Sequence, residues 1–157
     1  MEELLDFLAE VTISAGDWHT TLITTKGRLY TCGWNNYGQL GTGDYRNRSR
    51  LTHIVVPEPI IAVSTKRFYT VFITVEGRLF ACGDNKYGQL GTDDNEYRSH
   101  LSLTTDLTSI VSVSTGSCHT VLGTVDGRIY TCGDNSFNQL GTGDGQNRFS
   151  PTLIPID

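Results

Sequence analysis

The sequence GRLYTCGWNNYGQLGTGD at residues 27–44 recurs as GRLFACGDNKYGQLGTDD at residues 77–94 and as GRIYTCGDNSFNQLGTGD at residues 127–144. The three segments follow one another at a spacing of 50 residues, with no gap or insertion between them. A fixed period of this length is typical of repeat architectures, in which each copy folds as one supersecondary unit. The chain is therefore a tandem array of three copies of one repeat.

Each copy has the pattern of short antiparallel strands joined by tight turns. A glycine-containing pair, such as KG at residues 26–27, separates two strand-like runs and predicts a central hairpin. One more run precedes the hairpin, at residues 11–14, and another follows it, at residues 51–56. Adjacent apolar residues such as Leu22 and Ile23 favour strands that are covered on both faces. We predict an all-β fold, in which three four-stranded antiparallel repeats of about 50 residues are blades of a β-propeller.

The predicted organisation is a lead-in at residues 1–10, as a strand or short helix, followed by blades at residues 11–60, 61–110 and 111–157. Propellers close with at least four blades, so three blades leave two apolar faces open. We expect one of three solutions. The chain is part of a longer propeller, or it is a homo-oligomer in which two copies form a six-bladed ring, or the lead-in covers one end.

The run after each hairpin has the same glycine, asparagine and glutamine positions in the three copies. Its glycines predict positive φ angles or close backbone approach. Asn138 replaces Gly38 and Gly88, and asparagine is the non-glycine residue that best tolerates the left-handed conformation. We interpret this signature as structural, together with two histidines ahead of the hairpin. Its residues are Gly33, Asn35, Gly38, Gln39, Leu40, Gly41, Gly83, Asn85, Gly88, Gln89, Leu90, Gly91, Gly133, Asn135, Gln139, Leu140, Gly141, His19 and His119.

The pattern G-x-x-H-T at residues 16–20 and 116–120, followed by G-R-[LI]-[YF]-x-C-G-x-N-x-x-G-Q-L-G-T-G, resembles the repeat of the regulator of chromosome condensation family. The resemblance covers nearly all of the chain after residue 10. It implies a propeller that usually closes with seven blades and that binds other proteins through its loop faces. The second repeat departs from the pattern, with Lys66 for glycine and Tyr69 for histidine.

The resemblance implies three alternative functions. We favour a non-catalytic protein-interaction module whose variable loops bind partner proteins. The second is guanine-nucleotide exchange on a small GTPase, the activity of the founding member, although no insertion resembling its wedge interrupts the even spacing. The third is substrate recognition for a ubiquitin ligase acting in trans, because 157 residues filled by repeats leave no room for a HECT domain.

The composition is that of an ordinary globular domain, with 38% apolar and 18% charged residues. A formal net charge of -5 and a pI near 5.2 provide no positive field for nucleic acid or anionic lipid. No apolar run reaches the ~20 residues that cross a bilayer, and the acidic start MEELLDFLAE does not resemble a secretory signal. We therefore expect an intracellular protein, cytoplasmic or nuclear, with no nucleic-acid or membrane partner.

The sequence predicts no catalytic site, no cofactor and no metal. GQLGTG at residues 38–43 lacks the spacing of a phosphate-binding loop and has counterparts in every repeat. His19 and His119 occupy equivalent positions, where we expect structural histidines hydrogen-bonded to neighbouring backbone. The acidic run at residues 93–96 lacks the spacing of a calcium loop. The cysteine spacing fits no zinc site, and three of the four cysteines are equivalent positions too far apart for disulfides.

Positions at which the copies differ are the candidate partner-binding residues, because residues that hold a blade together should repeat. They lie in two loops, one before the His-Thr pair and one after the Q-L-G box. Loops on a rigid scaffold often carry binding, and arginine and aromatic residues are favoured interface anchors, while drift on a solvated loop is the alternative. Arg48, Arg98 and Arg148 repeat, so we interpret them as structural. The candidates are Asp17, Trp18, Tyr45, Arg46, Arg50, Arg67, Phe68, Tyr97 and Phe149.

Overall fold

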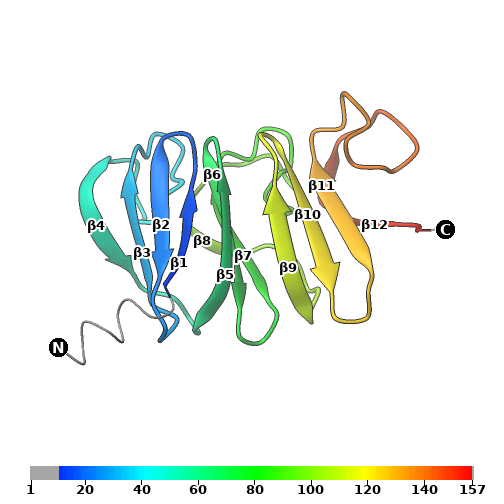
Figure 1. The fold of residues 1–157 in the computed structure, drawn as a ribbon. Helices are drawn as coiled ribbons and strands as arrows, with labels where there is room; N and C mark the ends of the chain where they lie inside the picture. Colours follow the sequence, from blue (N-terminus) through cyan, green and yellow to red (C-terminus); the bar gives the residue numbers. More distant parts are fainter. Residues whose placement is uncertain (1–10, 157) are drawn as a thin grey trace.

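The computed structural model describes residues 11–156, which form three four-stranded antiparallel sheets and no helix (Figure 1). The first sheet contains β1 (Thr12–Ala15), β2 (His19–Ile23), β3 (Leu29–Gly33) and β4 (Arg48–Ile54). The second contains β5 (Ile60–Lys66), β6 (Tyr69–Thr74), β7 (Leu79–Gly83) and β8 (Arg98–Leu103). The third contains β9 (Ile110–Thr115), β10 (His119–Thr124), β11 (Ile129–Gly133) and β12 (Arg148–Ile154). The predicted all-β fold is confirmed, whereas the lead-in at residues 1–10 lies outside the described residues.

The strands of each sheet pair in sequence order, as an antiparallel meander. This order places the turn between the first two strands and the long loop between the last two at the same end of the sheet. The three sheets stand side by side with these connections at one common end, which we call the loop end (Figure 1). Within residues 11–156, no helix is long and apolar enough to span a membrane.

The core lies between the sheets. Ile23 of the first sheet and Phe72 of the second belong to one buried cluster. On the opposite face of the second sheet, Val71 and Leu79 pack in another cluster with Leu122 of the third sheet. Strands β6 and β7 are consequently buried at every residue. This two-sided cover confirms the interpretation of their adjacent apolar residues.

The first and third sheets each have one face that no described residue covers. Ile13 on β1 is 70% exposed, whereas Val63 and Val113 at the equivalent position pack against the preceding sheet. On the third sheet, Val121 is only half-buried, whereas its counterpart Val71 is fully buried. The described residues therefore form an open row of blades with an apolar face at each end.

Hydroxyl groups form the same hydrogen bonds at both junctions between sheets. At the first junction the Ser14 and Thr65 hydroxyl oxygens are 2.8 Å apart, and the Thr70 hydroxyl donates to the Gln39 carbonyl oxygen at 2.8 Å. The equivalent pairs at the second junction are Ser64–Thr115 and Thr120–Gln89. Repetition of these bonds explains why the hydroxyl positions recur in the sequence.

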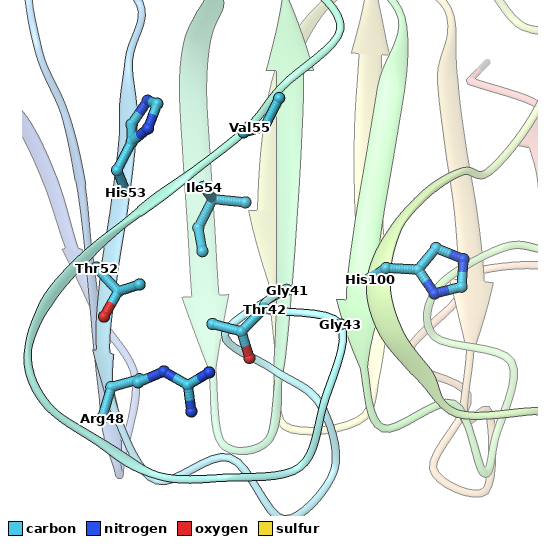
Figure 2. Close-up of a pocket in the computed structure, with 9 residues that line it drawn as sticks. All are labelled: Gly41, Thr42, Gly43, Arg48, Thr52, His53, Ile54, Val55 and His100. Carbon is cyan, nitrogen blue, oxygen red and sulfur yellow. The ribbon is translucent and has the colours of Figure 1, made fainter.

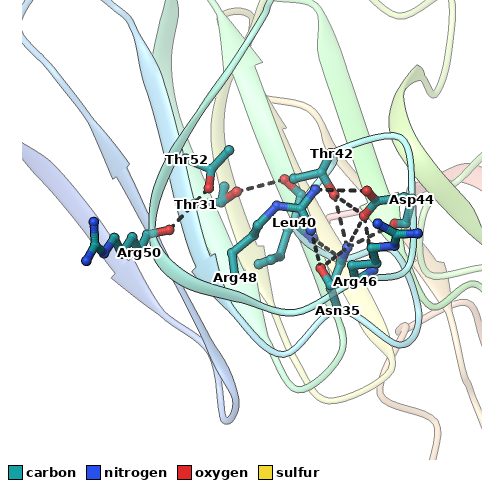
Figure 3. A network of polar contacts seen from close by, with 9 residues as sticks. All are labelled: Thr31, Asn35, Leu40, Thr42, Asp44, Arg46, Arg48, Arg50 and Thr52. Carbon is teal, nitrogen blue, oxygen red and sulfur yellow. Dashed lines mark hydrogen bonds and ion pairs between the residues drawn. The ribbon is translucent and has the colours of Figure 1, made fainter.

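The long loop of each repeat folds around one buried asparagine, and Figure 3 shows this loop in the first repeat. In the first repeat this is Asn35, whose carboxamide oxygen accepts a hydrogen bond from the Leu40 N–H at 2.9 Å. Its Nδ2 group donates to oxygen atoms further along the loop, which are Thr42 Oγ1, Asp44 O and Arg46 O. Asn85 and Asn135 accept from leucine and donate to threonine and aspartate in the same way. A single side chain thus satisfies several backbone groups of a loop that has no regular structure.

The repeated arginine at the end of each loop closes that loop. Arg48 forms an ion pair of 2.8 Å with Asp44, and its Nη1 group donates to the Arg46 carbonyl oxygen at 2.7 Å. Hydrogen bonds from Arg48 and from the Arg46 N–H hold the pKa of the Asp44 carboxyl well below its usual range. The other repeats contain the equivalent ion pairs Arg98–Asp94 and Arg148–Asp144.

Candidate partner-binding site

Both kinds of variable loop contribute side chains to one surface at the loop end of the first two sheets. The rings that meet there come from the turns before β2 and β6 and from the long loops after β3 and β7. They are Trp18, Trp34, Tyr37, Phe68 and Tyr97, which we call the aromatic surface. The sequence comparison named Trp18, Phe68 and Tyr97, but it missed Trp34 and Tyr37.

Three of the four ring contacts in the aromatic surface cross the junction between the two sheets. Tyr37 stacks on Phe68, with 4.9 Å between ring centroids and 25° between ring planes. Tyr97 meets Tyr37 edge-on, at 5.2 Å and 69°. Trp34 lies 5.2 Å from Phe68 and 5.6 Å from Tyr37. Aromatic pairs at such distances contribute about 0.5–1.5 kcal/mol beyond the area they bury, so the rings hold one another in place.

A pocket of about 290 Å³ opens in the aromatic surface, between Trp18, Trp34 and Phe68. Trp18 is 63% exposed, and the other two rings are half-buried. The Cζ atom of Arg67 lies 5.2 Å from the centroid of the Phe68 ring. The chain has no other tryptophan. Walls of this kind suit a bulky apolar group, and the fluorescence of both indoles would change when such a group binds.

Two of these rings replace side chains that close the loop in another repeat. Where the first repeat has Trp34, the second has Asp84, whose Oδ1 accepts a backbone N–H two residues further on at 3.0 Å. Where the second repeat has Tyr97, the first has Asn47, whose Oδ1 accepts a loop N–H at 2.8 Å. Each such bond contributes about 1 kcal/mol to stability. The first repeat therefore lacks the aspartate bond and has Trp34 in its place, and the second repeat lacks the asparagine bond and has Tyr97 in its place.

The second repeat displays Arg67 and Phe68 on a two-residue turn. Lys66 pairs with Tyr69 at the end of the β5–β6 ladder, which leaves only these two residues at the tip. Arg67 has a φ of 44°, although it is not glycine. Lys66 also forms an ion pair of 3.8 Å with Asp17 of the first sheet. A left-handed conformation costs a non-glycine residue about 1 kcal/mol or more, so this turn is strained.

The departures of the second repeat at Lys66 and Tyr69 have one common cause. In the first repeat a Cβ atom on Gly16 would lie 2.7 Å from Cε1 of His19, so the histidine ring requires glycine there. The Tyr69 ring instead extends toward the third sheet, where its hydroxyl donates to the His119 carbonyl oxygen at 2.6 Å. Because the second repeat has no histidine ring against residue 66, it can have the side chain of Lys66 where the first repeat requires glycine.

The remaining sequence candidates lie outside the aromatic surface. Tyr45 and Arg46 are exposed in the first long loop, and Arg50 is exposed on β4. Phe149 belongs to the second junction, where its carbonyl oxygen accepts the Asp93 N–H at 2.9 Å. The candidates therefore lie in three places, which are the first junction, the second junction, and the long loop and last strand of the first sheet.

His19 lies at the first junction, beneath the loop end. Its Nε2 atom is 2.7 Å from the Thr70 hydroxyl of the second sheet, so its partner is a side chain rather than the backbone that we expected. Burial lowers the pKa of His19 to about 4, against an opposing effect of Asp17. Burial also lowers the pKa of His119, which is half-buried on the open face of the third sheet. His19 is consequently neutral at neutral pH.

A second pocket, of about 330 Å³, lies between β4, residues 41–43 and β8 (Figure 2). The imidazoles of His53 and His100 stand on opposite sides of it. Arg48 also lines it, but its guanidinium is engaged by Asp44. In the part of the chain that the structure describes, no three or more metal-binding side chains gather. The aromatic surface thus remains the stronger candidate site.

Two sequence profiles, both described as the regulator of chromosome condensation (RCC1) repeat, match most of the chain. One matches residues 11–39, 60–89 and 110–139, and the other matches residues 26–73, 76–122 and 126–157. The chain belongs to the RCC1 repeat family. Three matches in each profile confirm the resemblance that the glycine and histidine patterns indicated.

Two solved structures share this RCC1-repeat fold. Human WBSCR16 superimposes with a TM-score of 0.83 and 25% identity, over 96% of this chain and 39% of that one. Prp20p from Saccharomyces cerevisiae superimposes with a TM-score of 0.83 and 20% identity, over 92% of this chain and 38% of that one. The chain thus spans about two fifths of each solved protein.

Curated relatives match shorter stretches of this RCC1-repeat chain. Human RCC1 domain-containing protein 1 is 48% identical over 40 residues, which are 26% of this chain and 11% of that protein. The serine/threonine-protein kinase Nek9 of Xenopus laevis is 52% identical over 42 residues, 27% of this chain and 4% of the kinase. The E3 ubiquitin-protein ligase highwire of Drosophila melanogaster is 42% identical over 50 residues, 32% of this chain and 1% of the ligase. The chain therefore spans about a tenth or less of each relative.

Proposed function

We propose that this RCC1-repeat chain is a non-catalytic protein-interaction module and that the aromatic surface binds its protein partner. One observation carries the proposal: rings from two sheets gather at the loop end, and most of them stand where the repeats differ. The third repeat has Cys118, Asp134 and Asn147 at the positions of Phe68, Trp34 and Tyr97. Exposed apolar patches mark interaction sites, and aromatic residues with arginine dominate interface hot spots.

Comparison of the long loops gives no support to the exchange of guanine nucleotides on a small GTPase. These loops have the same length in the three repeats, at residues 34–47, 84–97 and 134–147. None of these three long loops is therefore extended into a wedge. A role beside a ubiquitin ligase rests on a match to 1% of highwire and on no feature of the site.

The four cysteines are free thiols, which supports an intracellular location.

Affinity purification from a cell extract tests the proposal. The baits are the native chain, the double variant Trp34→Ala/Phe68→Ala and the single variant Phe137→Ala. Phe137 is 87% exposed and occupies the Tyr37 position in the third repeat, so it is a matched aromatic residue outside the aromatic surface. Thermal unfolding of each bait verifies that it is folded.

We expect partner proteins to bind the native chain and Phe137→Ala, and to be lost from the double variant. Recovery of the same proteins on the folded double variant would refute the assignment of the aromatic surface. Loss of the partners on Phe137→Ala alone would place the binding site on the third repeat instead.

A further inference from the structure

Beside the aromatic pocket lies a smaller pocket of about 150 Å³, and the two share the ring of Phe68. Two tyrosines of the aromatic surface line the smaller pocket, and so do the cationic side chains of Arg67 and Lys86. Asp84 lines it as well, but its Oδ1 already accepts the Lys86 N–H at 3.0 Å. An apolar site therefore lies next to a polar site in which the two cations outnumber the one carboxylate, that of Asp84.

Arg67 and Lys86 have no carboxylate within 4.0 Å among residues 11–156. The guanidinium of Arg67 lies over Phe68, and the ammonium of Lys86 lies 5.2 Å from the ring centroid of Tyr87. The arginines that close the long loops, such as Arg48, are neutralised by aspartate. The charges of Arg67 and Lys86 are thus available to a ligand, against the formal net charge of -5 on the chain.

The backbone holds Arg67 at this place against a conformational cost. Its φ of 44° is a left-handed angle, whereas the equivalent residues Asp17 and Ser117 have no such angle. Strained backbone persists where the surrounding structure fixes it, and it concentrates at functional sites. Arg67 and Phe68 form the tip of this strained turn, where Arg67 lines the smaller pocket and Phe68 lines both pockets.

We propose that the aromatic surface recognises a segment of a partner protein with a bulky apolar residue next to one or two acidic residues. The apolar side chain enters the pocket between Trp18, Trp34 and Phe68. The adjacent carboxylate reaches Arg67 and Lys86, where a charge-assisted hydrogen bond with the guanidinium fixes its position. This inference rests on the proposed function, because it names the ligand of the same surface.

The same pockets disfavour two other ligands. A methylated lysine needs free aromatic faces, but the Arg67 guanidinium already lies over Phe68, and no carboxylate lines the apolar pocket. A single-stranded nucleic acid stacks on aromatic rings and needs a positive groove along its backbone. Two cations on a chain of net charge -5 do not form such a groove.

Tryptophan fluorescence measures this recognition directly, since both tryptophans of the chain line the apolar pocket. The probes are the peptide Ser-Gly-Leu-Asp-Asp-Gly-Ser, its counterpart with Lys-Lys for Asp-Asp, and its counterpart with Ala for Leu. A short oligothymidine is the fourth probe. Titrations use the native chain, Arg67→Ala and the control Arg46→Ala, an exposed arginine outside the aromatic surface.

We expect the Leu-Asp-Asp peptide to change the emission and to bind about threefold to tenfold more tightly than the Lys-Lys peptide. Arg67→Ala should reduce this preference to below about twofold, whereas Arg46→Ala should leave it unchanged. Equal binding of the acidic and basic peptides, tighter binding of the basic peptide or the oligothymidine, or no binding of any peptide would overturn the inference. Retention of extract partners that depend on Trp34 and Phe68 would then preserve the proposed function and discard only this ligand class.

Discussion

Gly88 of the second sheet lies so close to Phe149 of the third that a Cβ atom at residue 88 would be 2.7 Å from the Phe149 Cα atom. Gly38 has the same relation to Ser99 at the first junction, at 2.5 Å. The third repeat has Asn138 at this position, with a φ of 60°. Left-handed geometry is therefore common to all three residues, but close contact with a following sheet demands glycine at the first two. By the same geometry, another sheet docked on the third would meet the Asn138 side chain.

Substitution of Gly88 by asparagine tests whether contact or conformation requires glycine. Asparagine tolerates the φ of 84° at Gly88, but its Cβ atom would collide with the backbone of the third sheet. We expect Gly88→Asn to lower the free energy of unfolding by about 1–3 kcal/mol. Gly143→Asn is the control, because Gly143 has a φ of 80° and no atom within 4 Å of a Cβ at that position.

Urea unfolding of the two variants measures this difference. Gly143→Asn should change stability by no more than about 1 kcal/mol, because asparagine is suited to that backbone angle. Equal loss in both variants would show that the left-handed angle, rather than the packing between sheets, selects glycine.

Loss of the asparagine that organises a long loop should be costly. Asn35→Ala removes a buried side chain that bonds four loop groups, and it leaves the Leu40 N–H without its acceptor. We expect a decrease in the free energy of unfolding of about 2–4 kcal/mol. Asn36→Ala, at the adjacent exposed residue, should cost less than about 0.5 kcal/mol. Similar melting temperatures for the two variants would contradict the role assigned to Asn35.

Stability should fall between about pH 6.5 and pH 4 because of His19. Its pKa is about 4 in the folded protein and about 6.5 in an unfolded chain, so in this window the unfolded state binds a proton that the folded state does not. Above pH 6.5 both states are neutral, and the full stability is present. The free energy of unfolding should drop by up to about 3 kcal/mol as the pH falls through the window.

His19→Gln retains a hydrogen-bond donor for Thr70 but cannot titrate. Its unfolding free energy should therefore depend less on pH than that of the native chain in urea titrations across the same window. His119→Gln is the control, and it should flatten the curve less, because His119 is only half-buried. The same pH dependence in the native chain and His19→Gln would contradict the burial effect.

The repeat unit, its strands and the left-handed loop positions were predictable from the sequence because their signals are local. Asn138 stands where the other repeats have glycine, and it has a positive φ angle, as predicted. The partner of His19 was not predictable, since it depends on which hydroxyl the next sheet brings within reach. Packing between blades is set by residues that are about 50 positions apart in the sequence.

Only part of the aromatic surface was predictable, and for a related reason. Tyr37 has aromatic counterparts at Tyr87 and Phe137, so a search for differences between repeats passes over it. Trp34 lies inside the repeated signature, where Asp84 marks the difference, but that run was interpreted as structural. The structure identifies both residues, because the junction places them against Phe68.

Site-specific photocrosslinking from residue 34 is the most direct test of the aromatic surface. p-Benzoylphenylalanine replaces Trp34 in one variant and Phe137 in another, and both are illuminated in cell extract. We predict that residue 34 forms covalent adducts with discrete protein partners and that residue 137 forms none of these adducts. Equal adducts from both positions, or adducts from residue 137 alone, would contradict the assignment of the binding site.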